Sequence, residues 1–330
     1  MSEAATRRRP RTHKRDMRGA ATLTAGLAIL LALPLFLNDY TQYIANAILV
    51  YSLAGLGFNI VLGYLGQLAF INAAFFGLGA YATALGMRLL GIPFWLMLPP
   101  AAAIGAAAGV LTALPALRLK RYYLAIVTMT LSELLRWVYV HSDVTGGASG
   151  LAVPDGTIFG ISLDSGMRKY FVYLAVTIAI YASTRALLRS RFGRAIAAVR
   201  QNEAAAASLG IEPARVKLIA FAWSGAIVAI AGALFSILLG RIDPTGFDLS
   251  QLLLQFAIVM IGGLGSLAGS AIGALLLTGA PELLRNLPGL EEIAFALLLI
   301  VVLIFVPEGL GGIIARRVPA LADRFHGGRT

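Results

Sequence analysis

The chain of 330 residues is far too apolar for a soluble protein, with 58% hydrophobic residues against 13% charged ones and a mean hydropathy of +0.81. It has no cysteine, which excludes disulfides and thiolate metal sites, and its histidines, His13, His141 and His326, are too scattered for a metal cluster. The formal net charge of +11 comes from Lys and Arg blocks beside apolar segments, a pattern that indicates membrane topology and argues against nucleic-acid binding.

The N-terminus begins with a basic tail, predicted as residues 1–19, ahead of a first apolar run at 20–37. The run is about as long as the hydrocarbon core requires. Asn38-Asp39-Tyr40 follows it, where a signal peptide would carry small residues for cleavage. We therefore expect a retained membrane span, with the basic tail in the cytoplasm by the positive-inside rule.

Further apolar runs predict membrane-spanning helices, each near the length of about 20 residues that a crossing needs. They lie at 43–63, 68–90, 94–114, 122–140, 170–188, 218–239 and 291–306. The segment 251–280 is too long for one ordinary span and is interrupted by Gly262-Gly263-Leu264-Gly265-Ser266, which indicates two short spans or a re-entrant pair. The prediction is an all-α polytopic membrane protein of about ten transmembrane helices, with eight as the alternative, some of them broken or re-entrant, and without a soluble domain.

Polar residues within these spans are candidates for a translocation pathway. Gln67 and Asn72 lie beside a glycine-broken helix start, where they can hydrogen-bond either a zwitterion or a neighbouring helix. Glu133 is the clearest ionisable group within a span, and ionisable groups in a bilayer are costly and often functional. Arg136 follows three residues later on the same helical face, so a structural ion pair and a pathway role both stay open for Glu133.

A short internal similarity links two glycine-rich segments. The sequence GYLGQLA at 63–69 recurs as GGLGSLA at 262–268, with five of seven positions identical. Transporters are often built from repeats whose broken helices approach the substrate path, although chance competes in a chain so rich in Gly, Ala and Leu. If the repeat is genuine, Gly262 and Gly263 belong with Gln67 among the candidate pathway residues.

Charge bias assigns sides to the loops. With the N-terminal tail inside, alternation places the basic cluster 118–121 and the loop 189–217 in the cytoplasm and the loop 141–169 outside. The tail 313–330 is basic too, and its cytoplasmic placement requires an even number of crossings, which favours two passes within 251–280. Both termini are therefore expected in the cytoplasm.

The cytoplasmic loop is a basic, alanine-rich helical segment that must contact something outside the membrane. Alanines favour helix and leave a smooth surface, an acidic residue offers an anchor, and a glycine followed by proline ends the helix. The residues of this predicted docking motif are Glu203, Ala204, Ala205 and Gly210. The alternative is a helix lying on anionic lipid through its arginines, Arg191, Arg194 and Arg200.

Other mechanisms need groups that the sequence lacks. A proton-driven carrier normally shows several buried acids or histidines, and this chain offers essentially one, Glu133. None of its lysines is followed by Ser or Thr, so it has no phosphate loop and cannot hydrolyse ATP by itself. The spans also lack a nucleophile with a base and a metal cluster, so we expect neither catalytic nor metal-binding residues and no enzyme activity.

Several motifs, in order along the chain, carry a resemblance to a known family. They are GLGFNIVLGYLGQLAFINAAFFGLGAY (55–81), YLAIVTMTLSELLR (123–136), TGG (145–147), SRFGRAIAAVRQNEAAAASLGIEPARVKLIAF (190–221), IGGLGSLAGSAIGALLL (261–277) and VPEGLGG (306–312). From about Tyr43 to Gly312 the chain resembles the LivM-type permease subunit of branched-chain amino acid ABC importers. It departs from that family at Ala69, Ile71-Asn72 and Arg121, where a serine, a Gly-His pair and a glycine are usual.

The resemblance implies a permease domain over 20–312 in a bacterial inner membrane, with 189–217 as its coupling loop. The implied partners are a homologous second permease, two cytoplasmic ATPases that carry ATP and Mg, and a periplasmic or lipid-anchored substrate-binding protein. No cofactor is expected on the chain itself. Branched-chain amino acids are the expected cargo, with another amino acid, urea or short amides as alternatives. An ion-coupled secondary carrier is the alternative from another class, motivated by Glu133 and the broken helices.

Overall fold

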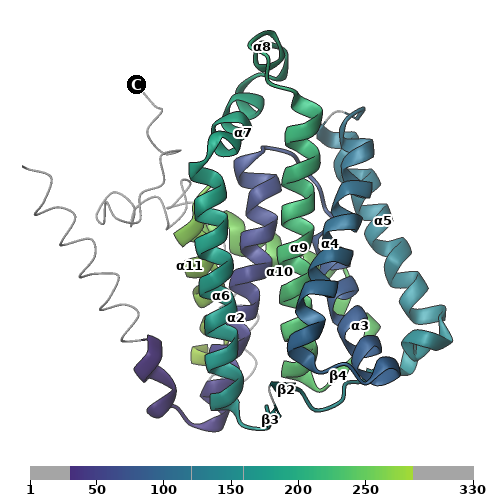
Figure 1. The fold of residues 1–330 in the computed structure, drawn as a ribbon, viewed down its shortest axis with the longest axis vertical. Coiled ribbons are helices and arrows are strands. Elements are labelled where there is room, and N and C mark those ends of the chain that lie inside the picture. The colour runs from purple at the N-terminus through teal and green to yellow at the C-terminus, as the bar shows by residue number, and fades with distance from the viewer. Residues whose placement is uncertain (1–29, 120, 159, 285–330) are drawn as a thin grey trace, which may run out of the picture.

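The computed structural model describes residues 30–119, 121–158 and 160–284, which form a bundle of helices (Figure 1). Within these residues, six helices are long and apolar enough to cross a membrane, so the chain is a multi-pass membrane protein. They are α2 (Asp39–Asn59, prolonged by the π-helical turn η2, Ile60–Tyr64), α3 (Asn72–Leu90), α4 (Phe94–Ala116), α5 (Arg121–His141), α6 (Gly166–Arg189) and α9 (Pro213–Leu239).

The six helices coincide with six of the predicted spans, so hydropathy located them correctly. Their ends differ where local chemistry overrides hydropathy. The helix predicted from residue 68 begins at Asn72, because the chain first runs through the left-handed Gly66. Most of the predicted span 20–37, all of 291–306 and the tails 1–19 and 313–330 lie outside the described residues. The total of ten helices therefore stays a prediction.

Helix α9 forms the centre of the bundle and packs closely against α2, α3 and α4. Glycines permit this approach: a Cβ on Gly105 of α4 would collide with the carbonyl of Gly225, and a Cβ on Gly79 of α3 would collide with the backbone of Ala229. Small residues at helix interfaces are the usual means by which helices associate tightly in lipid. The small-residue faces of these spans are therefore packing surfaces.

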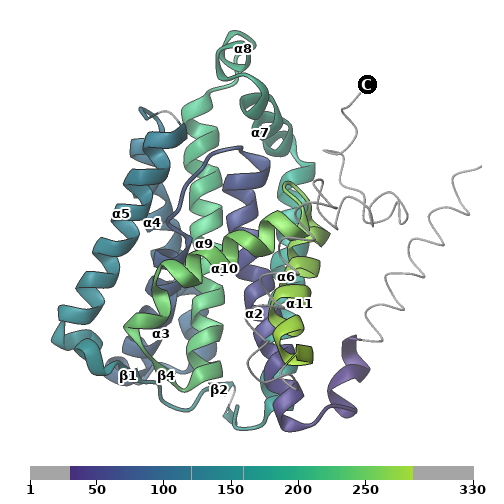
Figure 2. The same cartoon turned by 180° about the vertical axis from the view of Figure 1, so that it is seen from behind.

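The segment 251–280 is a pair of shorter helices, α10 (Leu249–Gly262) and α11 (Leu267–Leu284), separated by a glycine-containing bend. Helix α10 is about 21 Å long, at 1.5 Å per residue, which is too short to cross a bilayer. It climbs obliquely across the bundle, and α11 turns back beside α2 (Figure 2). The predicted interruption is therefore confirmed, whereas the choice between two short spans and a re-entrant pair stays a prediction.

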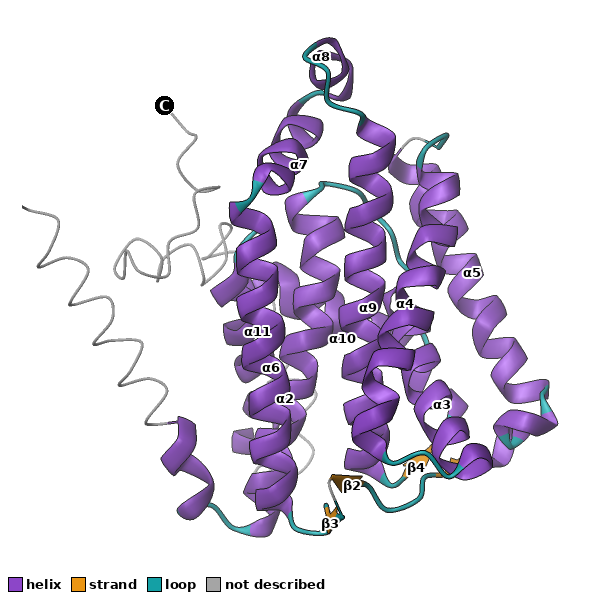
Figure 3. Ribbon diagram, viewed as in Figure 1, coloured by secondary structure: helices purple, strands orange, loops and turns teal. Residues whose placement is uncertain are grey.

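Helices and strands mark opposite ends of the bundle. At one end, here called the α8 end, lie α7 (Arg191–Gln201) and α8 (Glu203–Ser208). At the other, the β end, two small antiparallel pairs form, β1 with β4 in the register Leu151↔Ile242, and β2 with β3 (Figure 3). The elements not yet bounded are η1 (Leu33–Leu35), η3 (Asp143–Thr145), η4 (Gly147–Ser149), β1 (Leu151–Ala152), β2 (Thr157–Ile158), β3 (Ile161–Ser162), β4 (Arg241–Ile242) and η5 (Pro244–Phe247).

Candidate functional site

The local sequence fixes the shape of the predicted docking segment. Asn202 caps α8, because its Oδ1 accepts hydrogen bonds of 3.0 Å from the backbone N–H groups of Ala204 and Ala205. Gly210 has a φ of +80°, and its N–H donates to the carbonyl of Ala207 at 3.0 Å, which ends the helix as predicted. Pro213 then opens α9 at its first turn, where a missing N–H is harmless.

Helix α8 presents an apolar knob away from the bundle. Ala206 is its buried residue, whereas Ala204, Ala205 and Ala207 are exposed. Leu209 directly follows the helix and is 79% exposed. In Figure 1 this segment is the part of the α8 end that projects furthest. A largely exposed leucine beside exposed alanines makes a surface suited to a complementary apolar groove.

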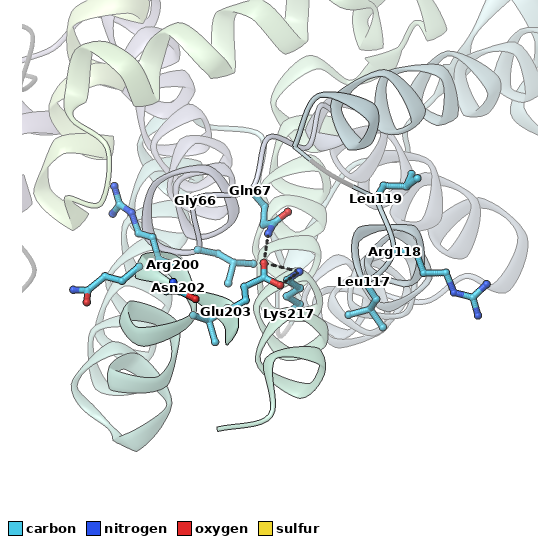
Figure 4. A pocket seen from close by; sticks show the side chains of 12 residues that line it. Gly66, Gln67, Leu117, Arg118, Leu119, Arg200, Asn202, Glu203 and Lys217 are labelled. Carbon is cyan, nitrogen blue, oxygen red and sulfur yellow. Dashed lines mark hydrogen bonds and ion pairs between the residues drawn. The ribbon is translucent and has the colours of Figure 1, made fainter. Parts of the chain in front are cut away.

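The carboxylate of Glu203 faces its own chain. Its Oε1 and Oε2 lie 2.8 Å and 2.9 Å from Nζ of Lys217, a side chain that is 6% exposed, against 48% for Glu203 (Figure 4). Gln67 Nε2 donates to Glu203 Oε1 at 3.3 Å, and Lys217 Nζ donates to the carbonyl of Ala116 at 3.4 Å. Glu203 therefore links α8 to the start of α9, and through these contacts to the end of α4 and the turn after η2.

A cavity of about 380 Å³ lies beside this cluster. It is lined by residues 65–67, 117–119 and 199–203 and by Lys217, which come from four chain segments (Figure 4). Charge bias predicts these segments to lie on one side of the membrane, and the structure brings them to one end of the bundle. Gln67, singled out as a pathway candidate, thus belongs to the same cluster as the docking motif.

Asn72 makes hydrogen bonds between helices. Its Nδ2 donates to the carbonyl of Ala54 at 3.2 Å and to Oε1 of Gln255 at 2.5 Å. Both amide side chains are buried, and Nε2 of Gln255 has no hydrogen-bond partner among the described residues. Of the two predicted alternatives, the described contacts of Asn72 are interhelical, and they hold α10 against α2 and α3.

The two similar glycine segments lie against each other. Gly66 and Gly265, which correspond in the similarity, have φ values of +74° and +76°. Asn59 is completely buried between the segments: its Oδ1 accepts from the N–H of Gly265 at 2.8 Å, and its Nδ2 donates to the carbonyl of Ser266 and to Ser270 Oγ, both at 2.9 Å. The internal similarity therefore corresponds to a left-handed glycine at the same position of each segment.

Gly262 and Gly263 lie at the bend between α10 and α11. A Cβ on Gly262 would collide with the carbonyl of Gly269 on α11, so the two short helices touch backbone to backbone. Gly263 has a φ of +112°, a conformation that side chains disfavour. These glycines are thus required by the close turn between α10 and α11.

The predicted pair between Glu133 and Arg136 is confirmed. Arg136 Nε lies 2.7 Å from Glu133 Oε2, and the arginine and glutamate side chains are 34% and 42% exposed. Both belong to α5, which lies at the edge of the bundle (Figure 1). The structure therefore does not bring Glu133 into the cluster around Glu203.

Comparison with known proteins gives the family. Residues 40–307 match the family model described as the branched-chain amino acid transport system permease component. The chain belongs to this permease family. It is 34% identical over 314 residues to the high-affinity branched-chain amino acid transport system permease protein LivM of Escherichia coli K12, covering 87% of this chain and 74% of that protein. No solved structure matches the chain.

A second group of permease proteins is also similar to this chain. LivH of E. coli K12 is 27% identical over 286 residues, covering 79% of this permease and 91% of LivH. BraD of Pseudomonas aeruginosa is 26% identical over 296 residues, covering 83% and 96%. Because the homologues are transporter permease subunits, this permease is a transport protein. The part of the chain that the structure describes holds no cluster of three or more His, Cys, Asp or Glu suited to a metal ion.

Three important residues were not identified from the sequence. Lys217 and Asn59 act through partners distant in the chain, which a local pattern does not reveal. A buried asparagine within an apolar span was nevertheless a usable signal for Asn59, since amides in membranes normally have partners. Leu209 offered a signal as well, as an apolar residue next to the glycine that ends the docking helix.

Proposed function

We propose that this permease is the membrane-spanning subunit of an ATP-binding cassette importer that moves branched-chain amino acids into the cytoplasm, powered by separate ATPase subunits. Family membership supports the transport role. The observation that carries the coupling role is α8, a short, capped, exposed helix at the projecting end of the bundle. ATP and Mg would be held by the ATPases, with no cofactor on this chain.

The docking surface consists of Ala204, Ala205, Ala207 and Leu209. Its shape is rigid, because the cap at Asn202 and the left-handed turn at Gly210 fix both ends. Leu209 is the apolar anchor for a groove on the ATPase, since transfer of an exposed leucine side chain from water into an apolar groove is favourable. Glu203 contributes indirectly, by holding α8 on Lys217.

The α8 end would then face the cytoplasm and the β end the outside, in a bacterial inner membrane with both termini in the cytoplasm. The basic cluster 118–121 and the arginines of α7 support this orientation by the positive-inside rule. The substrate-binding protein, periplasmic or lipid-anchored, would deliver its ligand at the β end. We assign the transmembrane domain to 20–312.

A second, homologous permease would cover α5. Helix α5 is the least buried of the candidate spans and leaves the Glu133–Arg136 pair partly exposed. Charged groups are costly against lipid, so such a pair favours a face covered by protein or by a water-filled path. The similarity of this chain to both LivM and LivH, two permease proteins of the E. coli system, supports a heterodimer. The translocation pathway would run between this subunit and the second permease, with Asn72, Gly262 and Gly263 shaping the broken helices of this subunit.

Reconstitution tests the proposal directly. The permease is assembled in proteoliposomes with the second permease, the ATPases and the binding protein, and uptake of labelled leucine is measured with and without ATP. We expect uptake that requires ATP and every subunit. Uptake by this chain alone, driven by a proton or sodium gradient, would instead identify a secondary carrier. Competition by urea or short amides against leucine tests the cargo.

Matched variants test the docking surface. Leu209→Ala removes the apolar anchor, and the control Ser208→Ala removes an exposed hydroxyl from the preceding residue, the last of α8. Loss of an anchor typically costs about 2 kcal/mol of binding, roughly thirtyfold in affinity. We expect ATPase co-purification to fall for Leu209→Ala and to persist for Ser208→Ala. Equal recovery of the ATPases with both variants would exclude Leu209 as the anchor.

A further inference from the structure

Arg200 differs from the other arginines of α7 in the direction it faces. It follows Gly193 by seven residues and Ile196 by four, so it lies on their stripe of the helix, and that stripe is buried against the bundle. All three arginines of α7 are exposed to solvent, but Arg200 also lines the cavity beside Glu203, and Arg191 and Arg194 do not. The three arginines predicted as one lipid-contacting group therefore differ in position, because Arg200 alone among them borders this cavity.

The side chain of Arg200 lies beside both glycine breaks. A Cβ placed on Gly66 would be 3.1 Å from Cγ of Arg200 and 3.7 Å from its Nε. A Cβ placed on Gly265 would be 3.4 Å from Nη1 of Arg200 and 3.6 Å from the carbonyl oxygen of Gly63. The aliphatic stem thus covers the first break, and the guanidinium reaches the second.

The location suits a planar cation. Both breaks follow the C-terminal end of a helix, since η2 ends at Tyr64 and α10 ends at Gly262. The last carbonyl groups of a helix carry partial negative charge, which a nearby cation stabilises. Guanidinium offers five N–H donors in a fixed fork, so one arginine can serve two chain segments at once, which a lysine cannot do equally well.

Arg200 also belongs to the docking segment itself. It is followed within three residues by Asn202, which caps α8, and by Glu203, which holds α8 on Lys217. Arg200 is therefore less than one helical turn from α8 along the chain, so a displacement of α8 also moves Arg200. Asn59, the last residue of α2, precedes the first break by a few residues and hydrogen-bonds Gly265 and Ser266 at the second, so it ties the two breaks together.

We propose that Arg200 is the positioning residue that transmits movement of α7 and α8 to both glycine breaks, at Gly66 and Gly265. It deepens the proposed function and rests on it: the ATPases move α8, and Arg200 converts that movement into a joint shift of the two broken segments. Arg191 and Arg194 have no part in this step.

The experiment compares Arg200→Ala, Arg200→Met and Arg200→Lys with the control Arg194→Ala, each in the complete reconstituted importer. The quantity measured is leucine taken up per ATP hydrolysed, together with subunit recovery and the melting temperature. For Arg200→Ala we expect this ratio to fall about tenfold, within the range typical of coupling between sites, while ATP hydrolysis continues. Arg194→Ala should stay within about twofold of the wild type, as surface substitutions usually do.

The conservative variants separate the contribution of the aliphatic stem of Arg200 from that of its positive charge. Arg200→Met keeps the stem over Gly66 and loses the cation, and Arg200→Lys keeps both and loses the fork. We expect the uptake ratio to decrease in the order Lys, Met, Ala. Should Arg200→Ala fail to assemble, Arg200→Lys decides: a lowered ratio in an intact complex supports the proposal, and a wild-type ratio overturns it.

Other outcomes overturn the inference in distinguishable ways. A normal ratio in Arg200→Ala, or an equal fall in Arg194→Ala, excludes a specific role for Arg200 while leaving ATP-driven uptake by the wild type intact. Absence of ATP-driven uptake by the wild-type complex refutes the proposed function, and this inference with it. A loss of melting temperature without any change in the uptake ratio identifies Arg200 as purely structural.

Discussion

Two of the ion pairs among the described residues have similar chemistry but very different separations along the chain. Glu133 and Arg136 lie one turn apart on α5, with both side chains partly exposed. Glu203 and Lys217 are separated by 14 residues, and the lysine is almost completely buried. The first pair depends on the geometry of one helix, whereas the second exists only when the docking loop, the start of α9 and the end of α4 are assembled. The separation of the two residues along the chain, more than their ionic chemistry, therefore decides whether an ion pair is a local contact within one helix or a tertiary contact.

The largest effect should follow from breaking the second pair. Glu203→Ala leaves the ammonium of Lys217 buried without its carboxylate, which costs about 2–4 kcal/mol, less than for a fully buried pair because Glu203 is half exposed. Lys217→Met keeps the length of the side chain without a charge and should cost less. Thermal unfolding of the purified permease measures both.

The double variant sharpens this test. With Lys217→Met in place, Glu203→Ala no longer leaves a buried charge, so the double variant should be more stable than Glu203→Ala alone. The stability change of the double variant minus the sum of the changes in the two single variants gives the interaction free energy of the pair. Strictly additive effects would show that the pair does not hold the docking loop.

A smaller effect is expected at the third member of the cluster. Gln67→Ala removes the hydrogen bond to Glu203 Oε1 and should cost about 1 kcal/mol. Its effect should largely disappear in the Glu203→Ala background, because the acceptor is then absent. Thermal unfolding of the wild type, the two single variants and the double variant tests this. An undiminished cost in that background would place the role of Gln67 elsewhere, for example in the translocation pathway.

The contrast between the two pairs also explains what the sequence could predict. Hydropathy located six helices, because a crossing helix needs a long apolar run whatever its neighbours are. The glycine run at 262–266 predicted the interruption between α10 and α11, and the three-residue spacing predicted Glu133 with Arg136. The hydrogen-bond partner of Asn59 could not be predicted, since Ser266 lies 207 residues away. Nor could the inward direction of Glu203, which depends on where α9 begins.

The smallest effect on stability should follow from breaking the local pair. Glu133→Gln and Arg136→Gln remove an attraction between residues one turn apart that is worth about 0.5 kcal/mol or less, because both side chains are partly exposed. The isolated permease should therefore unfold within about one degree or two of the wild type, given that 1 kcal/mol shifts the midpoint of a larger domain by about 2–4 °C. If α5 faces a second permease, the same substitutions should reduce recovery of the heterodimer or leucine uptake much more than they reduce stability, because the pair is then enclosed at an interface where a lone charge is costly. Thr130→Ala, an exposed neighbour on α5, provides the control for the face as a whole. Recovery and uptake unchanged in both variants of the pair would mean that Glu133 and Arg136 lie against lipid headgroups or water, and that the partner covers another surface.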